Sequence, residues 1–162
     1  MYILGDIGNS ETKIFLVNSK DKILKNINFS TKKINNKILR SKLKLLVSDF
    51  KNIKKILFCS VVPESFYLIK KFLSNKTKIR CYEIKNLNLK SLINVKVNYK
   101  QVGSDRLTNA ISLINNKDNF IILDFGTATT FDVVIKKTYK GGVIAPGIKI
   151  SLNNLSDKAT LI

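Results

Sequence analysis

The chain has 162 residues, of which 44% are hydrophobic, so it is long enough to bury a core and fits one ordinary domain or two small ones. Its apolar runs fall short of the roughly 20 residues that cross a bilayer, and its start has no signal-peptide pattern, so we expect a cytoplasmic protein without membrane association. The formal net charge is +18, but all but three of the 29 cations are lysines, scattered along the chain. We interpret this charge as surface solvation and expect no specific nucleic-acid partner, because nucleic-acid readers favour clustered arginines.

The absence of histidine limits the chemistry that the chain can perform. It excludes Ser-His-Asp chemistry, histidine metal sites and histidine proton shuttles. An acid or base catalyst must then be a carboxylate, lysine, tyrosine or cysteine. Cys59 and Cys81 lie in apolar surroundings without metal-like spacing, and we interpret them as buried thiols in a reducing compartment.

The first half of the chain predicts a three-stranded antiparallel meander followed by alternating helices and strands. Polar turns such as Gly8-Asn9-Ser10 separate the first apolar runs. Helical spacing of apolar residues after the meander indicates an α/β layer with a mixed sheet. The expected elements are strands at Tyr2–Ile7, Thr12–Asn18 and Ile23–Phe29, a helix at Ile34–Phe50, a strand at Lys54–Val62, a helix at Pro63–Ser74 and a strand at Lys78–Ile84.

The second half repeats the opening pattern. FIILDFGTATTFDVVI matches YILGDIGNSETKIFLV in having an apolar run, an Asp-x-Gly turn and a second apolar run. A polar connector precedes it, with a candidate strand at Val95–Tyr99. The further expected elements are a helix at Leu107–Asn116, strands at Phe120–Phe125 and Thr130–Ile135, a glycine-rich stretch at Gly141–Gly147 and a helix at Ile148–Ala159.

The repeated Asp-x-Gly turn suits a phosphate and a metal ion together. Backbone amides can cradle an anion where glycine allows close approach, and an aspartate at the strand end can hold Mg²⁺. Lys13 could neutralise a transferring phosphoryl group. The alternative is that Asp6 and Asn9 only form an Asx turn between core strands. Two copies in matching positions favour the first interpretation, because two hairpins facing each other across a cleft can hold a nucleotide from both sides.

Gly103-Ser104-Asp105-Arg106 precedes a predicted helix and is a second candidate site. A carboxylate beside a cation can accept a hydroxyl proton there, and Arg106 offers a planar fork for a carboxylate. The alternative is that Asp105 is a helix N-terminal acid favoured by the macrodipole, with Arg106 as its solvated neighbour. The glycines of Gly141–Gly147 indicate either backbone lying flat against a ligand or a neighbouring strand, or a plain pair of turns.

Five motifs resemble those of type III pantothenate kinases, in their order and spacing, through nearly the whole chain. They are DIGNSETK (Asp6–Lys13), SVVP (Ser60–Pro63), VGSDR with LTNA (Val102–Ala110), DFGTATTFDVV (Asp124–Val134) and GGVIAPG (Gly141–Gly147). The resemblance implies an α/β chain with the actin-like, duplicated ribonuclease-H-like fold, with mixed sheets and flanking helices. We expect an N-terminal actin-like domain at residues 1–108, with the ATP phosphate loop and the start of the substrate site, and the beginning of a second one at 109–162. Family members usually continue for many tens of residues, so the second domain is expected to be incomplete.

The resemblance also implies a homodimeric enzyme that phosphorylates pantothenate with ATP, in the first step of coenzyme A biosynthesis. Such an enzyme needs Mg²⁺ and a monovalent cation, K⁺ or NH₄⁺. Motif by motif, Asp105 is expected to accept the proton of the substrate hydroxyl, Asp124 to bind the monovalent cation and Asp6 to bind Mg²⁺. The expected ATP-binding residues are Asp6, Ile7, Gly8, Asn9, Ser10, Glu11, Thr12, Lys13 and Thr127, and the expected pantothenate-binding residues are Gly103, Ser104, Asp105, Arg106 and Tyr99.

Two positions depart from the family pattern and leave alternatives open. Lys96 and Tyr99 stand where the family often has Tyr and Pro, so either Tyr99 takes over the role of the missing ring or the pocket is altered. Two other functions remain: a kinase for another small hydroxylated acid, and a truncated relative that binds nucleotide or a partner protein without turnover.

Overall fold

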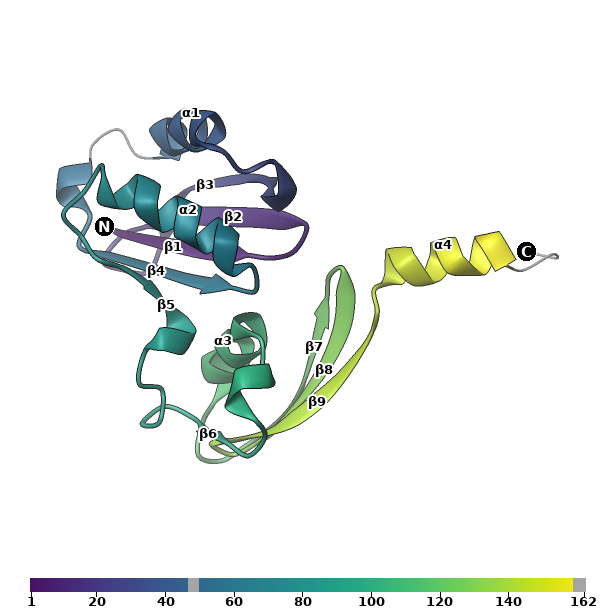
Figure 1. Ribbon diagram of the computed structural model, residues 1–162. Helices are drawn as coiled ribbons and strands as arrows, with labels where there is room; N and C mark the ends of the chain where they lie inside the picture. The colour runs from purple at the N-terminus through teal and green to yellow at the C-terminus, as the bar shows by residue number, and fades with distance from the viewer. Residues whose placement is uncertain (47–49, 159–162) are drawn as a thin grey trace. The chain divides into compact units, whose positions relative to one another are not determined.

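The computed structural model describes residues 1–46 and 50–158, as helices and strands joined mostly by short connections (Figure 1). The chain divides into two compact units, Met1–Asn88 and Leu89–Ile162, and each contains a mixed sheet with helices, as predicted. The boundary expected between residues 108 and 109 falls inside helix α3 (Ser104–Leu113), which packs on the sheet of the second unit. No helix in the described ranges is long and apolar enough to cross a membrane.

The sheet of the first unit consists of β1 (Tyr2–Ile7), β2 (Glu11–Val17), β3 (Ile23–Ser30), β4 (Lys55–Ser60) and β5 (Cys81–Glu83). Its strand order is β3-β2-β1-β4-β5. Tight turns join the first three strands into the predicted antiparallel meander. β4 pairs in parallel with β1 and with β5, because the connections between these strands carry the chain back along the sheet before each new strand begins.

Two helices, α1 (Asn36–Leu46) and α2 (Pro63–Ser74), share a core with one face of this sheet (Figure 1). Helix α1 buries Leu39, Leu43 and Leu46, which recur at helical spacing. Helix α2 has the predicted bounds. The helix predicted for residues 34–50 is shorter than expected, and the prediction for residues 47–49 lies outside the described residues. The described residues of this unit also form three short 3-10 turns, η1 (Thr31–Lys33), η2 (Phe50–Asn52) and η3 (Ile84–Asn86).

The core face of the sheet is distinct from the face that carries the candidate site residues. Ile3, Ile14 and Phe58 on the core face are fully buried. Gly5 pairs with Phe58, and a Cβ on Gly5 would lie 2.0 Å from the Phe58 ring, so only glycine leaves room for this ring. Because side chains alternate along a strand, Asp6 points to the opposite face.

The sheet of the second unit consists of β6 (Asn94–Val95), β7 (Asn119–Phe125), β8 (Ala128–Ile135) and β9 (Thr138–Pro146). The order is β6-β9-β8-β7, and β7, β8 and β9 form a second antiparallel meander. The prediction of a strand at Val95–Tyr99 is wrong beyond Val95, where β6 ends. The chain instead enters a 3-10 turn, η4 (Tyr99–Gln101), whose start is capped by the Asn98 side chain, which accepts a hydrogen bond from the Lys100 amide at 3.1 Å.

Helix α3 covers one face of this second sheet. Its residues Leu107 and Ala110 are fully buried, as is Val134 on β8. A further helix, α4 (Ile148–Lys158), follows β9. Helix α3 therefore supplies apolar cover for this sheet, together with Leu89, Ile93 and Val102 in the segment before it, which are also buried.

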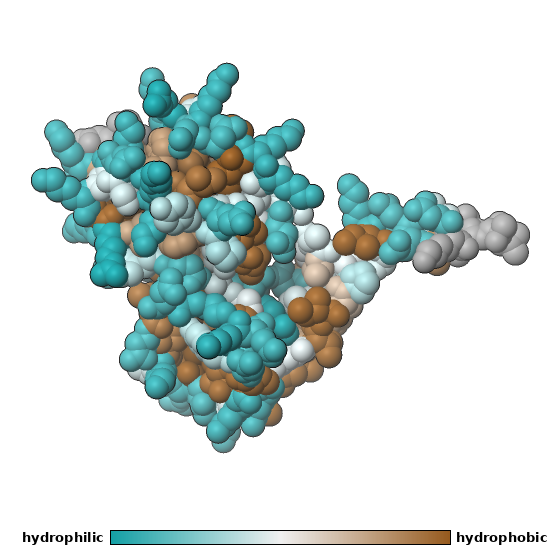
Figure 2. Space-filling view, in the orientation of Figure 1, coloured by the Kyte–Doolittle hydropathy of each residue, from teal (hydrophilic) through white to brown (hydrophobic). Residues whose placement is uncertain are grey.

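The other face of the second sheet is apolar and exposed. Ile121, Phe125 and Val143 are 69%, 62% and 65% exposed, and strand register places them on the face opposite Val134. Figure 2 shows hydrophobic surface over these strands. Contiguous apolar surface of this kind is typical of a surface that binds a partner.

Candidate functional site

Three polar side chains, those of Asp6, Lys13 and Cys59, lie beside the turn between β1 and β2. Asp6 lies between Lys13 of β2 and Cys59 of β4, its partners in the two strand ladders. Paired residues of a sheet point to the same face, so the three side chains stand side by side. The Cys59 thiol donates a hydrogen bond to Asp6 Oδ1 at 3.4 Å. The side chains of Asp6 and Lys13 therefore start from neighbouring positions on one face of the sheet, beside the turn.

The turn is held by backbone and by a residue outside the hairpin. The Gly8 amide donates to the Glu11 carbonyl at 3.0 Å. Thr31, which opens η1, donates its amide to the Ser10 carbonyl at 3.0 Å and its hydroxyl to the Gly8 carbonyl at 2.7 Å. Its hydroxyl also lies 2.9 Å from that of Thr12. Thr31 is not among the expected site residues, and its position directly after a strand that returns beside the turn is the signal that could have found it.

Of the other hairpin residues, Glu11 and Lys13 are partly exposed to solvent, whereas Ile7 and Thr12 are buried on the core face of the sheet. Lys13 Nζ lies 3.7 Å from Glu11 Oε2, and the Asn28 amide donates to Glu11 Oε1 at 2.8 Å. The Lys13 and Glu11 side chains are about half exposed, so their pairing is worth at most about 1 kcal/mol, and Lys13 can leave it for another anion. Ile7 and Thr12 are buried on the core face, away from Asp6.

The first turn of α3 presents the candidate base. Gly103 precedes the helix with extended backbone, and Ser104 is buried. Asp105 is half-buried, and its Oδ1 accepts a hydrogen bond from the Arg106 amide at 2.8 Å. The carboxylate of Asp105 therefore lies in the first turn of α3, next to the Arg106 amide.

The Arg106 guanidinium group is bound inside the second unit. Its Nε donates to both carboxylate oxygens of Asp132 on β8, at 2.8 and 3.1 Å, and its Nη2 lies 2.6 Å from Oδ1. The Tyr139 hydroxyl donates to the same Oδ1 at 2.5 Å. Asp132 is fully buried, and the Arg106 side chain is 12% exposed. Arg106 is therefore an ion-paired residue that ties α3 to the sheet, and not the solvated neighbour of Asp105.

The surroundings of Arg106 and Tyr139 raise the pKa of both groups and so favour their protonated forms. Burial lowers the pKa of Arg106, but the hydrogen bonds and charge of Asp132 outweigh it and raise the pKa overall. Burial, followed by the Asp132 hydrogen bond and charge, raises the pKa of Tyr139 well above its usual value. A Cβ on Gly142 would lie 1.9 Å from the Phe131 carbonyl and 2.8 Å from Arg106 Nη2, so glycine is required beside the pair. The backbone at Gly142 therefore lies flat against neighbouring residues of this unit.

Asp124, near the end of β7, is linked to α3 and faces an unsatisfied hydroxyl. The Asn109 side-chain amide donates to Asp124 Oδ2 at 2.9 Å. Thr130 lies directly opposite Asp124 in the β7–β8 ladder. Its Oγ1 is buried and has no hydrogen-bond partner among the described residues. A carboxylate beside an unused hydroxyl is an oxygen-rich environment that suits a hard cation.

The second hairpin turn is packed against the end of β9. Thr127 is exposed at the tip, and its carbonyl accepts a hydrogen bond from the Gly147 amide at 3.2 Å. The Gly126 amide donates to the Ala128 carbonyl at 2.9 Å. A Cβ on Gly147 would lie 2.4 Å from the carbonyl oxygens of Gly126 and Thr127, so glycine allows this close approach.

The two positions that depart from the family pattern lie in the segment before α3. The Lys96 amide donates to the Tyr139 carbonyl at 3.0 Å, which extends the pairing of β6 with β9, and its side chain is exposed. Tyr99 opens η4 and is half-buried.

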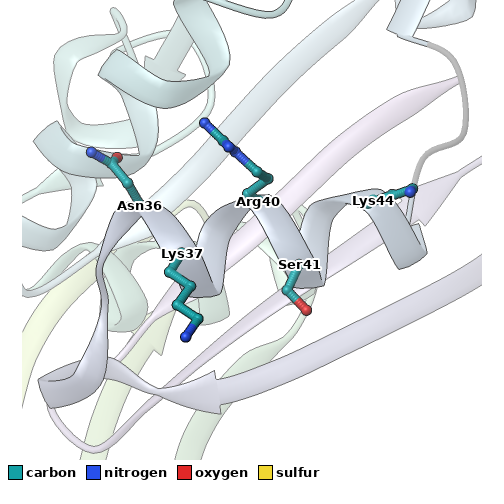
Figure 3. Close-up of a pocket in the computed structure, with 5 residues that line it drawn as sticks. All are labelled: Asn36, Lys37, Arg40, Ser41 and Lys44. Atoms are coloured by element: carbon teal, nitrogen blue, oxygen red, sulfur yellow. The ribbon is translucent and has the colours of Figure 1, made fainter.

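A shallow basic depression lies on the outer surface of α1 (Figure 3). All its labelled residues belong to this one helix, and its side chains diverge from the helix axis. They are Asn36, Lys37, Arg40, Ser41 and Lys44. Side chains that diverge from a single helix form a solvated surface, which agrees with our interpretation of the lysines.

The structure groups the predicted site residues by unit. Asp6 and Lys13 come together with the first turn in one unit, while Asp105, Arg106, Asp124 and Thr127 belong to the other. Within the described ranges, no three acidic, cysteine or histidine side chains cluster as a metal site would. Cys59 and Cys81 are not joined in a disulfide, and Cys81 is buried as predicted. The expected burial of Cys59 is wrong, because this residue lies beside Asp6 on the sheet face opposite the core and is only half-buried.

Comparison with other sequences identifies relatives over the whole chain. The sequence profile described as Type III pantothenate kinase matches residues 2–162. A type III pantothenate kinase from Pelagibacter ubique is 64% identical over 162 residues, which is 100% of this chain and 65% of the relative. One from Sulfurihydrogenibium is 37% identical over 168 residues, covering 98% of this chain and again 65% of the relative. The chain thus spans just under two thirds of the length of these curated relatives.

Solved structures support the fold. A conserved Baf family protein from Campylobacter jejuni has a TM-score of 0.56 at 22% identity, covering 98% of this chain and 61% of its own. The ethanolamine utilization protein EutJ from Carboxydothermus hydrogenoformans has a TM-score of 0.53 at 11% identity, covering 96% and 56%. At these identities the likeness concerns the fold alone, and it agrees with the predicted actin-like fold.

Proposed function

The chain belongs to the type III pantothenate kinase family, and we propose that it catalyses the ATP-dependent phosphorylation of pantothenate to 4'-phosphopantothenate, the first step of coenzyme A biosynthesis. The observation that carries this proposal is the family match over residues 2–162, which includes both Asp-x-Gly hairpins and the first turn of α3. The 64% identity to a relative named for this activity supports it further.

In this proposal the β1–β2 turn binds the phosphates of ATP, and Asp6 holds Mg²⁺. Asp6 is a single carboxylate beside the turn, and Mg²⁺ in kinases is typically held by one or two carboxylates together with substrate phosphates and water, so the residues fit. Mg²⁺ supplies neutralisation of the phosphate charge. Lys13, next to Asp6, adds a positive charge on the same face of the sheet.

The second hairpin binds a phosphate through Thr127 and a monovalent cation, K⁺ or NH₄⁺, through Asp124. The unsatisfied Thr130 hydroxyl opposite Asp124 supports a cation at this position, because a buried hydroxyl without a partner costs stability unless a ligand uses it. Asn109 occupies Asp124 Oδ2 and leaves Oδ1 for the ion.

Pantothenate binds at the first turn of α3, and Asp105 acts as the proton acceptor. The substrate hydroxyl oxygen attacks the γ-phosphorus of ATP, the bond from this phosphorus to the β–γ bridging oxygen breaks, and ADP leaves. The hydroxyl proton passes to the Asp105 carboxylate. Phosphoryl transfer depends mainly on positioning and charge neutralisation, so the absence of histidine from the chain is no obstacle.

Gly103, Ser104, Arg106 and Tyr99 complete the substrate site in this proposal. The Nε and Nη2 atoms of Arg106 already contact Asp132, so the pantothenate carboxylate would meet Nη1, the guanidinium nitrogen that these contacts leave. The ion pair fixes the guanidinium plane, which reduces the entropy lost when substrate binds.

We also propose that the chain forms a homodimer and acts in the cytoplasm. The exposed apolar face of the second sheet, with Ile121, Phe125 and Val143, offers surface that a partner subunit can cover. Sedimentation of the purified chain measures this directly, and a monomer at all concentrations would contradict it.

ADP release in a coupled assay with pantothenate, Mg²⁺ and K⁺ tests the proposed function. We expect turnover that depends on pantothenate and is lost in Asp105→Asn, which keeps the size of the side chain but removes the proton acceptor. An Asp105→Asn variant as active as the parent overturns the assigned base. Absence of turnover together with an ATP-induced rise in melting temperature would indicate nucleotide binding without catalysis.

A further inference from the structure

Thr31 contacts the β1–β2 turn from the far end of the meander. It follows β3, yet its amide bonds to the Ser10 carbonyl at 3.0 Å and its hydroxyl bonds to the Gly8 carbonyl at 2.7 Å. These two carbonyls flank the tip of the turn. A single threonine therefore holds both sides of the tip.

The direction of the hydrogen bonds follows from the chemistry of the groups. A carbonyl oxygen only accepts, so the Thr31 hydroxyl must give its one proton to Gly8. The Thr12 hydroxyl, 2.9 Å from Thr31 Oγ1, must then be the donor of that contact. Thr12 is fully buried and Thr31 is 5% exposed, so water does not replace these bonds easily. Thr12, Thr31 and Gly8 thus form a directed chain of hydrogen bonds that ends on the turn.

This arrangement orients the amides of the turn. In a trans peptide the C=O of one residue and the N–H of the next point in opposite directions, and the described residues contain no cis peptide. Because the Gly8 and Ser10 carbonyls point to Thr31, the amides of Asn9 and Glu11 point away from it. Successive backbone amides of a turn are the groups that bind anions in proteins, and these two are directed away from their support.

We propose that Thr31, with Thr12 as its hydroxyl donor, is a positioning residue of the nucleotide-phosphate site. By holding the Gly8 and Ser10 carbonyls, it directs the Asn9 and Glu11 amides toward the phosphates. This inference rests on the proposed binding of ATP at the β1–β2 turn. It also gives Thr12 a supporting role, because its side chain lies on the core face and does not reach the Asp6 face.

The experiment measures the affinity of the whole chain for ATP with Mg²⁺ by isothermal titration calorimetry. Thr31→Val keeps the shape of the side chain but removes the hydroxyl, and we expect roughly tenfold weaker binding because the Gly8 carbonyl is released. Thr31→Ser restores the hydroxyl and is expected to bind within about twofold of the parent. Should Thr31→Val not fold, Thr12→Val replaces it, with an expected loss of about threefold.

A control separates positioning from loss of stability. Ile69→Val trims the core of the same unit on α2, away from the turn, and is expected to lower the melting temperature without changing the ATP affinity. Equal ATP binding by the parent and by Thr31→Val, or by Thr12→Val in its place, overturns the positioning role while leaving the proposed function intact. Failure of the parent to bind ATP overturns the proposed function, and with it the role of Thr31 at a phosphate site.

Discussion

Removal of the Asp132 charge is expected to destabilise the second unit strongly. Asp132 is fully buried, and the Arg106 side chain is only 12% exposed, so Asp132→Asn leaves a guanidinium group with little access to water. Breaking one side of a buried ion pair typically costs about 3–5 kcal/mol. The asparagine oxygen can still accept from Tyr139, so we expect the lower end of this range, about 3 kcal/mol. Such a loss is a large fraction of the roughly 5–15 kcal/mol that stabilises a typical domain.

The loss in the free energy of unfolding can be measured for the second unit alone by urea titration, with the backbone NMR signals of α3 and β8 as the probe of unfolding. The control is the double variant Arg106→Leu with Asp132→Leu, which removes both charges and is expected to cost less than the sum of its two single substitutions. A loss below about 1 kcal/mol for Asp132→Asn, or additive single substitutions, would show that the pair is solvated like an exposed salt bridge and refute the reasoning.

Four further results are expected. Gly5→Ala should destabilise the first unit by about 1–3 kcal/mol in urea unfolding, because its methyl group would overlap the Phe58 ring, whereas an unchanged midpoint would contradict the packing. Cys59 should react with a thiol reagent in the native protein while Cys81 stays protected, because burial raises the pKa of Cys81 to about 12; two labelled thiols in the mass spectrum would contradict this. In the unfolded chain the Cys81 thiol ionises above about pH 8.5, whereas in the folded protein it stays neutral up to about pH 12. The free energy of unfolding should therefore decrease as the pH rises from about 8.5 to 12, and it should decrease less steeply in Cys81→Ala. Asn109→Ala should raise the K⁺ concentration for half-maximal activity roughly tenfold while the KM for ATP stays constant, and an unchanged K⁺ requirement would contradict the cation site.

Local patterns in the sequence predict much of the fold. Alternating apolar residues and polar turns predict the first antiparallel meander and the β7–β8 hairpin of the second, and Pro63 marks the start of α2. The segment before α3 is less predictable: the expected strand beyond Val95 is instead a 3-10 turn capped by Asn98, because a local side-chain hydrogen bond competes with strand pairing.

The candidate site is predictable where it consists of contiguous motifs and unpredictable where it depends on distant contacts. Asp6 and Lys13 lie in one motif, and hairpin pairing alone brings them together. Arg106 and Asp132 are 26 residues apart, and no local pattern indicates that a buried ion pair joins them. Thr31 likewise reaches Gly8 only because β3 returns beside the turn.

The most direct measurement is mass-spectrometric detection of 4'-phosphopantothenate after incubation of the chain with pantothenate, ATP, Mg²⁺ and K⁺. We predict that the parent forms this product and that Asp105→Asn forms none, although it binds ATP as tightly as the parent. Product formation at the same rate by Asp105→Asn, or no product from a parent that binds both substrates, would contradict the proposed kinase activity as assigned to these residues.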